Sequence, residues 1–277
     1  MPIIKDKLGS INVSSNYRSV CLTSIIIKIL DWIYIEIYGT ELGFHNLQFA
    51  YQQGISSVSC TWAVIETISY FKNNGSEVFV CSMDKTKAFD LCKFSLLFSN
   101  LVKSINPVYT QLLIFCYTNQ YSNVFFNGNV SENFPLRNGV GQGKVLAGFL
   151  YCYYCFELFE KLEKSGYGCK IKGTYAGIYG FSDDDIAVAP TYSSLVGMMS
   201  IIEEFCNEHG LTFSTNKNPQ KSKTKCIAWL NDKRNLPDIE LNGSKIPWVS
   251  KINHLGNVIS NGKYFLKMIW TKKWPNI

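Results

Sequence analysis

The stretch Gly180-Phe181-Ser182-Asp183-Asp184-Asp185 places three consecutive carboxylates between two apolar runs. These runs, from Tyr175 to Tyr179 and from Ile186 to Ala189, are typical of strands. Like charges a few ångströms apart repel one another and raise each other's pKa. A divalent cation would relieve that repulsion, and hard cations such as Mg²⁺ select carboxylate oxygens. The stretch therefore predicts either a metal site at a turn between strands or a solvated acidic turn, and alone it does not decide between them.

The composition is that of a folded protein rather than a disordered chain. Of the 277 residues, 47% are hydrophobic and 17% are charged, which allows one large domain or two small ones. The most apolar stretch, residues 25–37, is interrupted by Lys28, Asp31 and Glu36, and residues 1–10 lack an apolar signal core. No stretch is long enough to cross a bilayer, so we expect no membrane association.

Ten cysteines are scattered along the chain, and their spacing does not indicate a zinc finger. Cys152-x-x-Cys155 lies in an apolar segment typical of a buried helix, and Cys206-x-x-His209 ends another helical pattern. The separation between these two pairs is too long for a usual finger. Free thiols in a reducing compartment are the better interpretation, which favours an intracellular protein, nuclear or cytoplasmic.

Positive charge is concentrated in the C-terminal third. From Lys217 onward, 12 basic residues face 3 acidic ones, whereas the whole chain has 27 against 21. The same segment carries six large aromatic residues, Trp229, Trp248, Tyr264, Phe265, Trp270 and Trp274. Basic side chains interleaved with aromatic rings suit a nucleic-acid backbone, and the alternative is a lysine-rich soluble surface.

The remaining pattern mixes helices, strands and hairpins. Apolar spacing and start and stop signals predict helices at 58–71, 88–101, 107–117, 145–162 and 191–209. Residues 22–38 are either a helix or a mixed buried segment. A β-rich run over residues 78–83 delivers Asp84 at its end, and turn residues predict hairpins near Gly128, Asn242-Gly243 and Asn261-Gly262. This order predicts an α+β fold with an antiparallel sheet backed by helices on one side. Asp84 and the aspartates after Ser182 could then converge on one site.

Six short segments share their order and spacing with motifs of one enzyme family. They are Asn16-Tyr17-Arg18-Ser19-Val20, Gln48-Phe49-Ala50-Tyr51, residues 83–90 (MDKTKAFD), residues 138–146 (NGVGQGKVL), Phe181-Ser182-Asp183-Asp184 and His254-Leu255-Gly256. In that order they resemble the fingers motif N-Y-R-P-I, the motif Q-F-G-F-R, the first palm motif, the segment G-V-R-Q-G-x-x-L-S-P, the Y-A-D-D hairpin and the primer-grip Y-L-G. The chain thus resembles the reverse transcriptase domain of a non-LTR (LINE-type) retrotransposon.

The resemblance implies a right-hand polymerase fold of fingers and palm, with an antiparallel palm sheet backed by helices. Residues 1–235 would form the fingers and palm, and residues 236–277 the primer-grip hairpins and the start of a truncated thumb. The implied activity is RNA-directed DNA polymerisation. Its partners would be an RNA template, a DNA primer and deoxynucleoside triphosphates, with no stable protein partner.

The implied catalytic and metal-binding residues are Asp84, Asp183 and Asp184. They would hold two Mg²⁺ or Mn²⁺ ions, which stabilise the attacking and leaving oxygens of nucleotidyl transfer. A frame shifted by one, with Asp184 and Asp185 as the catalytic pair, remains an alternative.

The resemblance also assigns residues to the incoming nucleotide. Phe89 would stand against the sugar 2′ position, Gln142 would touch the nucleotide, Gly143 would let the backbone approach it, and Arg18 would lie near the triphosphate. The alternative for Phe89 is a core aromatic. His254, Leu255 and Gly256 would form the primer grip.

Two lysines, Lys221 and Lys223, are alternatives for the general acid that protonates the leaving pyrophosphate. Several positions depart from the family pattern, among them Ser19, Gly141 and Asp185. Asp185 places a charge where a strand normally carries an apolar side chain. These departures leave a second hypothesis, a catalytically inactive nucleic-acid-binding relic of such an element.

Overall fold

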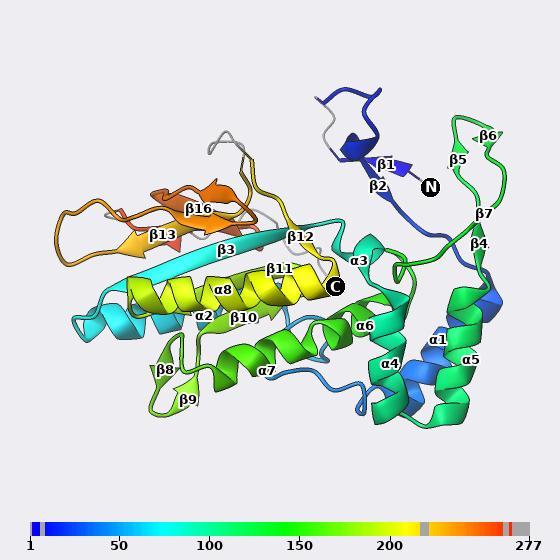
Figure 1. The fold of residues 1–277 in the computed structure, drawn as a ribbon, viewed down its shortest axis with the longest axis horizontal. Helices are drawn as coiled ribbons and strands as arrows, with labels where there is room; N and C mark the ends of the chain where they lie inside the picture. The colour runs from blue at the N-terminus through cyan, green and yellow to red at the C-terminus, as the bar shows by residue number, and fades with distance from the viewer. Residues whose placement is uncertain (1, 6–8, 217–221, 263–265, 268–277) are drawn as a thin grey trace, which may run out of the picture. The chain divides into compact units, whose positions relative to one another are not determined.

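Strand β3 (Val78–Thr86) is the centre of a five-stranded antiparallel sheet in the computed structural model (Figure 1). On one side β3 pairs with β11 (Asp184–Ala189), which pairs in turn with β10 (Ile178–Phe181). On the other side β13 (Lys225–Trp229) and β12 (Thr212–Phe213) pair with successive parts of β3. The strand predicted to end at Met83 therefore continues through Asp84 to Thr86.

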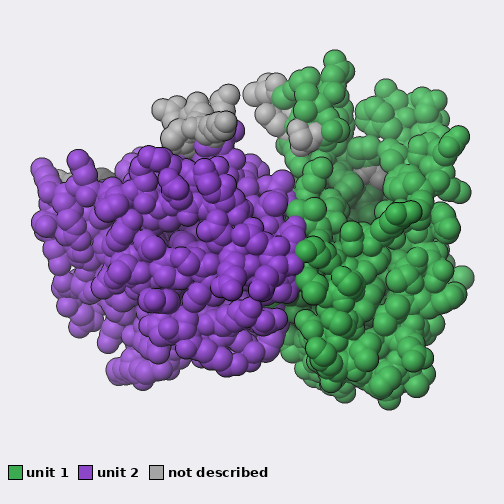
Figure 2. Space-filling view, in the orientation of Figure 1, with its two compact units in different colours: residues 1–44, 87–155 green, residues 45–86, 156–277 purple. Residues whose placement is uncertain are grey.

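The structure describes residues 2–5, 9–216, 222–262 and 266–267. The chain forms two compact units, coloured separately in Figure 2. Unit 1 comprises residues 1–44 and 87–155, and unit 2 comprises residues 45–86 and 156–277. The five-stranded sheet belongs to unit 2.

Helices cover both faces of this sheet, not one face as the sequence predicts. Helix α2 (Ser57–Asn73) buries Cys60, Val64 and Ile68 in one core cluster with alternate residues of β3, β11 and β13. Helices α8 (Tyr192–His209) and α7 (Phe156–Lys164) lie on the opposite face, where Phe79 of β3 meets Tyr192 of α8. Strands buried on both faces read as continuous apolar runs, as residues 78–81 and 186–189 do.

Tight hairpins complete unit 2. Strands β8 (Lys170–Ile171) and β9 (Thr174–Tyr175) pair, as do β14 (Ile239–Leu241) and β15 (Ser244–Ile246). Asn242 and Gly243 both have positive φ (50° and 67°), which confirms the predicted turn.

A three-stranded sheet follows, formed by β16 (Lys251–His254), β17 (Asn257–Ser260) and β18 (Leu266–Lys267). Strands β17 and β18 follow one another in the chain and pair antiparallel, with Ile259 opposite Leu266. The hairpin predicted near Asn261-Gly262 is therefore confirmed, since the connection begins directly after Ser260. A two-residue turn at Leu255-Gly256 joins β16 to β17.

Unit 1 is mainly helical. Its helices are α1 (Ile25–Tyr38), α3 (Ala88–Leu91), α4 (Phe94–Ser104), α5 (Pro107–Thr118) and α6 (Ala147–Tyr154). Its short elements are β1 (Pro2–Ile4) with β2 (Tyr17–Ser19), η1 (Ser14–Asn16), β4 (Tyr121–Ser122) with β7 (Phe134–Pro135), and β5 (Phe125–Phe126) with β6 (Asn129–Val130).

Two predicted helices are each divided in two. The helix predicted over residues 88–101 breaks at Cys92, whose carbonyl accepts a hydrogen bond from the Gly139 N–H (2.9 Å) instead of continuing the helix. The helix predicted over residues 145–162 breaks at Cys155, where the chain passes from unit 1 to unit 2. Within the described residues, no helix is both long and apolar enough to cross a membrane.

Candidate active site

The sheet of unit 2 brings two of the predicted carboxylates side by side. Asp84 on β3 is the direct partner of Asp184 at the start of β11. Directly paired residues on antiparallel strands project from the same face with Cβ atoms about 5 Å apart. Asp183 lies in the preceding two-residue turn with Ser182, between β10 and β11. Although Asp84 and Asp184 are distant in sequence, the β3–β11 register makes them neighbours.

The carboxylates repel one another. Burial, followed by the negative charges of Asp183, Asp84 and Asp185, raises the pKa of Asp184 to about 6, while Lys85 opposes the rise. Such a cluster is stabilised by a cation.

The backbone of Asp84 is held by the segment that follows helix α8. Its N–H donates to Thr224 Oγ1 (3.3 Å), and its carbonyl accepts from the Ser214 N–H (2.7 Å). The exposed Lys223 is thereby placed beside the site, with Nζ 3.4 Å from Asp84 Oδ2. Lys221, the alternative general acid, lies outside the described residues.

The donor set has the chemistry of a hard-cation site. Carboxylate oxygens are the ligands that Mg²⁺ prefers. The pKa of Asp184 is raised first by burial and then by repulsion from the neighbouring carboxylates, and a divalent cation would relieve that repulsion. In the described part of the chain, however, no three His, Cys, Asp or Glu side chains gather closely enough to hold a metal ion. In this structure the Asp84 carboxylate is paired with Lys223 instead.

Gln48 holds the turn that carries Asp183. Its buried side chain accepts a hydrogen bond from the Ser182 N–H (2.9 Å) and donates one to the Ser182 carbonyl (3.4 Å). Such support fits a turn in which Ser182 has a φ of 63°. Residues 47–49 also hydrogen-bond the backbone of Gly180 at the outer edge of β10. The sequence places Gln48 in a motif, but nothing in its spacing indicates this role.

Gly180 is needed because three side chains fill the space beside it. A β-carbon there would lie 2.6 Å from Phe159 Cζ, 2.7 Å from Gln48 Nε2 and 2.9 Å from Asp185 Oδ1. These distances are below any ordinary contact, so only glycine fits without displacing neighbours.

Asp185, the charge at a strand position that is normally apolar, has a partner in the core. Asp185 forms an ion pair with Lys85, and both side chains are only 1% exposed. Asp185 is the partner of Met83 in the β3–β11 register, and Lys85 lies two residues further along the same face. Asp184 and Asp185 project from opposite faces of β11, which argues against the shifted frame with those two as the catalytic pair. Nothing in the sequence links Lys85 to a residue one hundred positions away.

Unit 1 brings together the segments that carry the predicted nucleotide-binding residues. The Val140 N–H donates to the carbonyl of Phe89 (2.9 Å), and the Cys21 N–H donates to the carbonyl of Gln142 (2.8 Å). Gly143 has a φ of 101°, and a β-carbon there would lie 3.1 Å from the Cys21 carbonyl. Glycine at position 143 thus lets this loop approach Cys21, which follows strand β2 and its residue Arg18.

Arg18 is exposed, whereas Phe89 is half-buried and stacks on Tyr151 with ring centroids 4.8 Å apart. These residues belong to unit 1, whereas the carboxylates Asp84, Asp183 and Asp184 belong to unit 2.

The three residues predicted to form the primer grip differ in accessibility. His254 is 2% exposed, lies 3.9 Å from Cys60 Sγ, and has a pKa lowered to about 4 by burial. Leu255 packs against the core cluster, and Gly256 alone is exposed. The side chain of His254 therefore supports the hairpin from within, and the exposed part of the turn is backbone.

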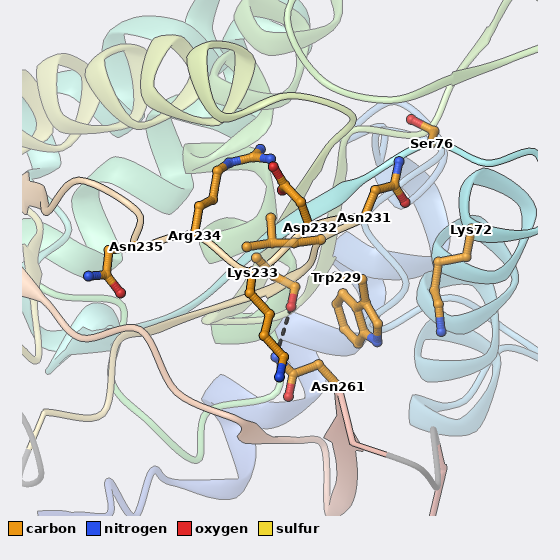
Figure 3. A pocket seen from close by; sticks show the side chains of 11 residues that line it. Lys72, Ser76, Trp229, Asn231, Asp232, Lys233, Arg234, Asn235 and Asn261 are labelled. Atoms are coloured by element: carbon orange, nitrogen blue, oxygen red, sulfur yellow. Dashed lines mark hydrogen bonds and ion pairs between the residues drawn. The ribbon is translucent and has the colours of Figure 1, made fainter.

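A hollow of about 880 Å³ opens elsewhere in unit 2 (Figure 3). It lies around Trp229, the partner of Val78, so it is at the opposite end of β3 from Asp84. Lys72 and Lys233 are among its lining residues, and Lys72 Nζ lies 5.9 Å from the Trp229 ring. Its size does not make it the active site, because it contains no member of the carboxylate group.

Solved structures with a similar fold include telomerases. An apo telomerase from Candida tropicalis truncated from its C-terminal domain is 12% identical, with a TM-score of 0.55 over 88% of this chain and 51% of that chain. A Candida tropicalis telomerase in complex with a TWJ fragment of telomeric RNA is 14% identical, with a TM-score of 0.53 over 89% and 37%. At such low sequence identity, the structural similarity establishes the fold alone. It confirms the expected α+β polymerase architecture.

Sequence comparison gives the family. A 115 kDa protein in the type-1 retrotransposable element R1DM of Drosophila melanogaster is 23% identical over 270 residues, or 92% of this chain. The chain spans about a quarter (24%) of that relative's length. The model of the family described as reverse transcriptase (RNA-dependent DNA polymerase) matches residues 4–257. Because that match covers most of its length, the chain belongs to the reverse transcriptase family.

Proposed function

We propose that this chain is an RNA-directed DNA polymerase of a LINE-type retrotransposon, which joins deoxynucleotides to a primer 3′-hydroxyl. The observation that carries the proposal is the β3–β11 register, which sets Asp84 directly beside Asp184 with Asp183 in the adjoining turn. Three carboxylates at the meeting of two strands suit phosphoryl transfer, where catalysis consists mainly of positioning and charge neutralisation.

Reverse transcriptases as a family use divalent metal ions. Here Asp84, Asp183 and Asp184 would hold two Mg²⁺ or Mn²⁺ ions, which when bound neutralise charge on the attacking and leaving oxygens. The chain's own part is to hold the carboxylates in place. Thr224 and Ser214 hydrogen-bond the backbone of Asp84, and Gln48 hydrogen-bonds the turn that carries Asp183.

The residues of unit 1 would bind the incoming nucleotide. The Arg18 guanidinium would contact the triphosphate, the Gly143 backbone would approach it, and Gln142 would contact the nucleotide. The ring of Phe89 would exclude a ribonucleotide 2′-hydroxyl, and its stacking on Tyr151 supports a fixed ring position.

The proton required by the leaving pyrophosphate would come from a lysine. Lys223 suits this role because it is exposed and already lies beside Asp84. Lys221 remains the alternative.

Residues 1–235 would act as fingers and palm, and residues 236–277 as the primer grip and the start of the thumb. The exposed backbone of Gly256 would be the part of the grip that meets the primer. An RNA template is proposed because the chain belongs to this family, and one telomerase of similar fold is a complex with RNA.

The test is primer extension on an RNA template with a DNA primer, deoxynucleoside triphosphates and Mg²⁺ or Mn²⁺. Asp84→Asn, Asp183→Asn and Asp184→Asn should each lower the rate about a hundredfold or more, because metal-assisted charge stabilisation is worth several kcal/mol. The control is Glu160→Gln, which alters an exposed ion pair with Lys164 on α7 and should leave the rate unchanged.

Full activity in Asp84→Asn would refute the assignment of the site. A folded wild-type protein that binds template–primer but never extends it would favour the inactive relic instead.

A further inference from the structure

We propose that Lys85 and Asp185 act together as positioning residues that fix the register of β3 against β11. By doing so they keep Asp84 opposite Asp184. Neither residue would touch the substrate. The inference rests on the proposed function only in taking Asp84 and Asp184 as catalytic.

The hydrophobic pattern of these strands specifies their register weakly. Residues 78–81 of β3 and 186–189 of β11 are buried on both faces, so neither run alternates between apolar and polar positions. In a strand with one buried face, a slip by one residue would expose the core set to solvent, and this penalty specifies the register. A slip between two runs that are apolar on both faces lacks that penalty.

The buried ion pair between Lys85 and Asp185 specifies the register that the apolar pattern leaves open. Lys85 and Asp185 lie on one face of the two strands, while Asp84 and Asp184 lie on the other. A slip by one residue would turn one member of the ion pair to the opposite face and leave two unpaired buried charges. Separating the members of a buried ion pair is strongly destabilising, so only the native register is tolerated.

The surroundings of Asp185 leave Lys85 as the contact that positions its carboxylate. Its other oxygen, Oδ1, has no hydrogen-bond partner within the described structure, and it lies beside Gly180 together with the side chains of Phe159 and Gln48. Asp183 and Asp184 are the nearest charges along the chain, and both repel Asp185. The attraction of Lys85 therefore determines where this carboxylate, and the start of β11, lies.

The test is a mutant cycle in the full chain. It combines Lys85→Met, Asp185→Leu, the apolar double variant Lys85→Met/Asp185→Leu, and the exchanged variant Lys85→Asp/Asp185→Lys. Urea unfolding measures stability, and steady-state primer extension measures kcat and the KM for deoxynucleotide separately.

Each single variant should unfold at a lower urea concentration and lose kcat at least a hundredfold. The apolar double variant should regain the wild-type unfolding midpoint, since two buried charges are replaced by apolar groups of similar size. Its kcat should nevertheless stay at least tenfold below wild type, with KM within about twofold. The exchanged variant should recover at least tenfold in kcat over the weaker single variant.

A stable apolar double variant with wild-type kcat would overturn the proposal, because the pair would then act only through stability. Single variants with wild-type kcat would overturn it as well. If the single variants do not fold, the kcat values of the double and exchanged variants still test whether the pair positions the catalytic residues. If wild-type protein never extends a primer, the proposed function fails, and additive unfolding effects in the cycle would separately refute the pairing.

Discussion

At the scale of single residues, the raised pKa of Asp184 makes stability depend on pH. The folded protein holds this proton up to about pH 6, whereas the unfolded chain releases it near its ordinary value of 3.8. Between these values the folded state binds more protons, so stability falls as pH rises. The pKa of the buried His254, lowered to about 4, contributes the opposite slope over the same range, so the Asp184 component is measured as a difference between two proteins. From pH 4 to pH 6.5 in EDTA, we expect the wild-type urea midpoint to fall relative to that of Asp184→Asn, and Mg²⁺ to reduce that relative fall. Asp184→Asn should remove this component, and an equal slope in both proteins would contradict the assignment.

Gly180 provides a second prediction at this scale. Gly180→Ala inserts a methyl group among Phe159, Gln48 and Asp185, and overpacking of this kind costs about 1–3 kcal/mol. The free energy of unfolding from urea titration measures the loss. Gly262→Ala is the control, since within the described residues its β-carbon would meet only Ser260 Oγ, at 3.4 Å. Equal effects of the two substitutions would show that the space beside Gly180 is not filled as described.

The sequence predicted some site residues but not those that position them. The acidic stretch and the strand before Asp84 could be recognised because local pattern places them at a turn and within a strand. Lys85 could not, because its role depends on a residue that only the β3–β11 pairing brings near. Gln48 could not be given a role for the same reason, since its contact with Ser182 joins segments 134 positions apart.

At the scale of elements, the β8–β9 hairpin has an unfavourable turn residue. Lys172 and Gly173 form its two-residue turn with φ of 50° and 87°, a conformation that asparagine tolerates better than lysine. We expect Lys172→Asn to stabilise unit 2 by about 0.5 kcal/mol, measured as a higher urea midpoint. Lys170→Asn, a strand position of the same hairpin, should give no gain. A lower midpoint for Lys172→Asn would contradict the turn geometry.

Predictions of elements succeeded where a local signal marks the boundary. Helix α8 begins at the cap Thr191 and ends before Gly210, whose φ is 69°, as its sequence indicates. The breaks at Cys92 and Cys155 carry no such signal. At Cys92 the helix ends because the Cys92 carbonyl accepts a hydrogen bond from the N–H of Gly139, which is distant in sequence. The apolar periodicity of the sequence continues through both breaks.

At the scale of the whole molecule, binding of nucleic acid should depend steeply on salt, because phosphate contacts release counterions. The hollow of Figure 3 offers a specific test, since Lys233 is exposed there, whereas the neighbouring Arg234 is paired with Glu77 and Asp232. Lys233→Ala should weaken template–primer binding and reduce the slope of log K against log salt by about 1.

Fluorescence anisotropy over a range of salt concentrations measures that slope. Lys164→Ala, which removes an exposed lysine paired with Glu160 on α7, is the control and should leave the slope unchanged. An unchanged slope in Lys233→Ala would place the nucleic acid elsewhere on the chain.

The Lys85–Asp185 pair also constrains how copies of this gene could recombine. The two codons are one hundred positions apart, so a crossover between them can join one half to a relative that carries apolar residues at both sites. The hybrid would bury one unpaired charge and lose stability even though both parents fold. Among mobile elements that diverge and exchange segments, this pair would be inherited as a unit, and hybrids divided between the two codons would be inactive.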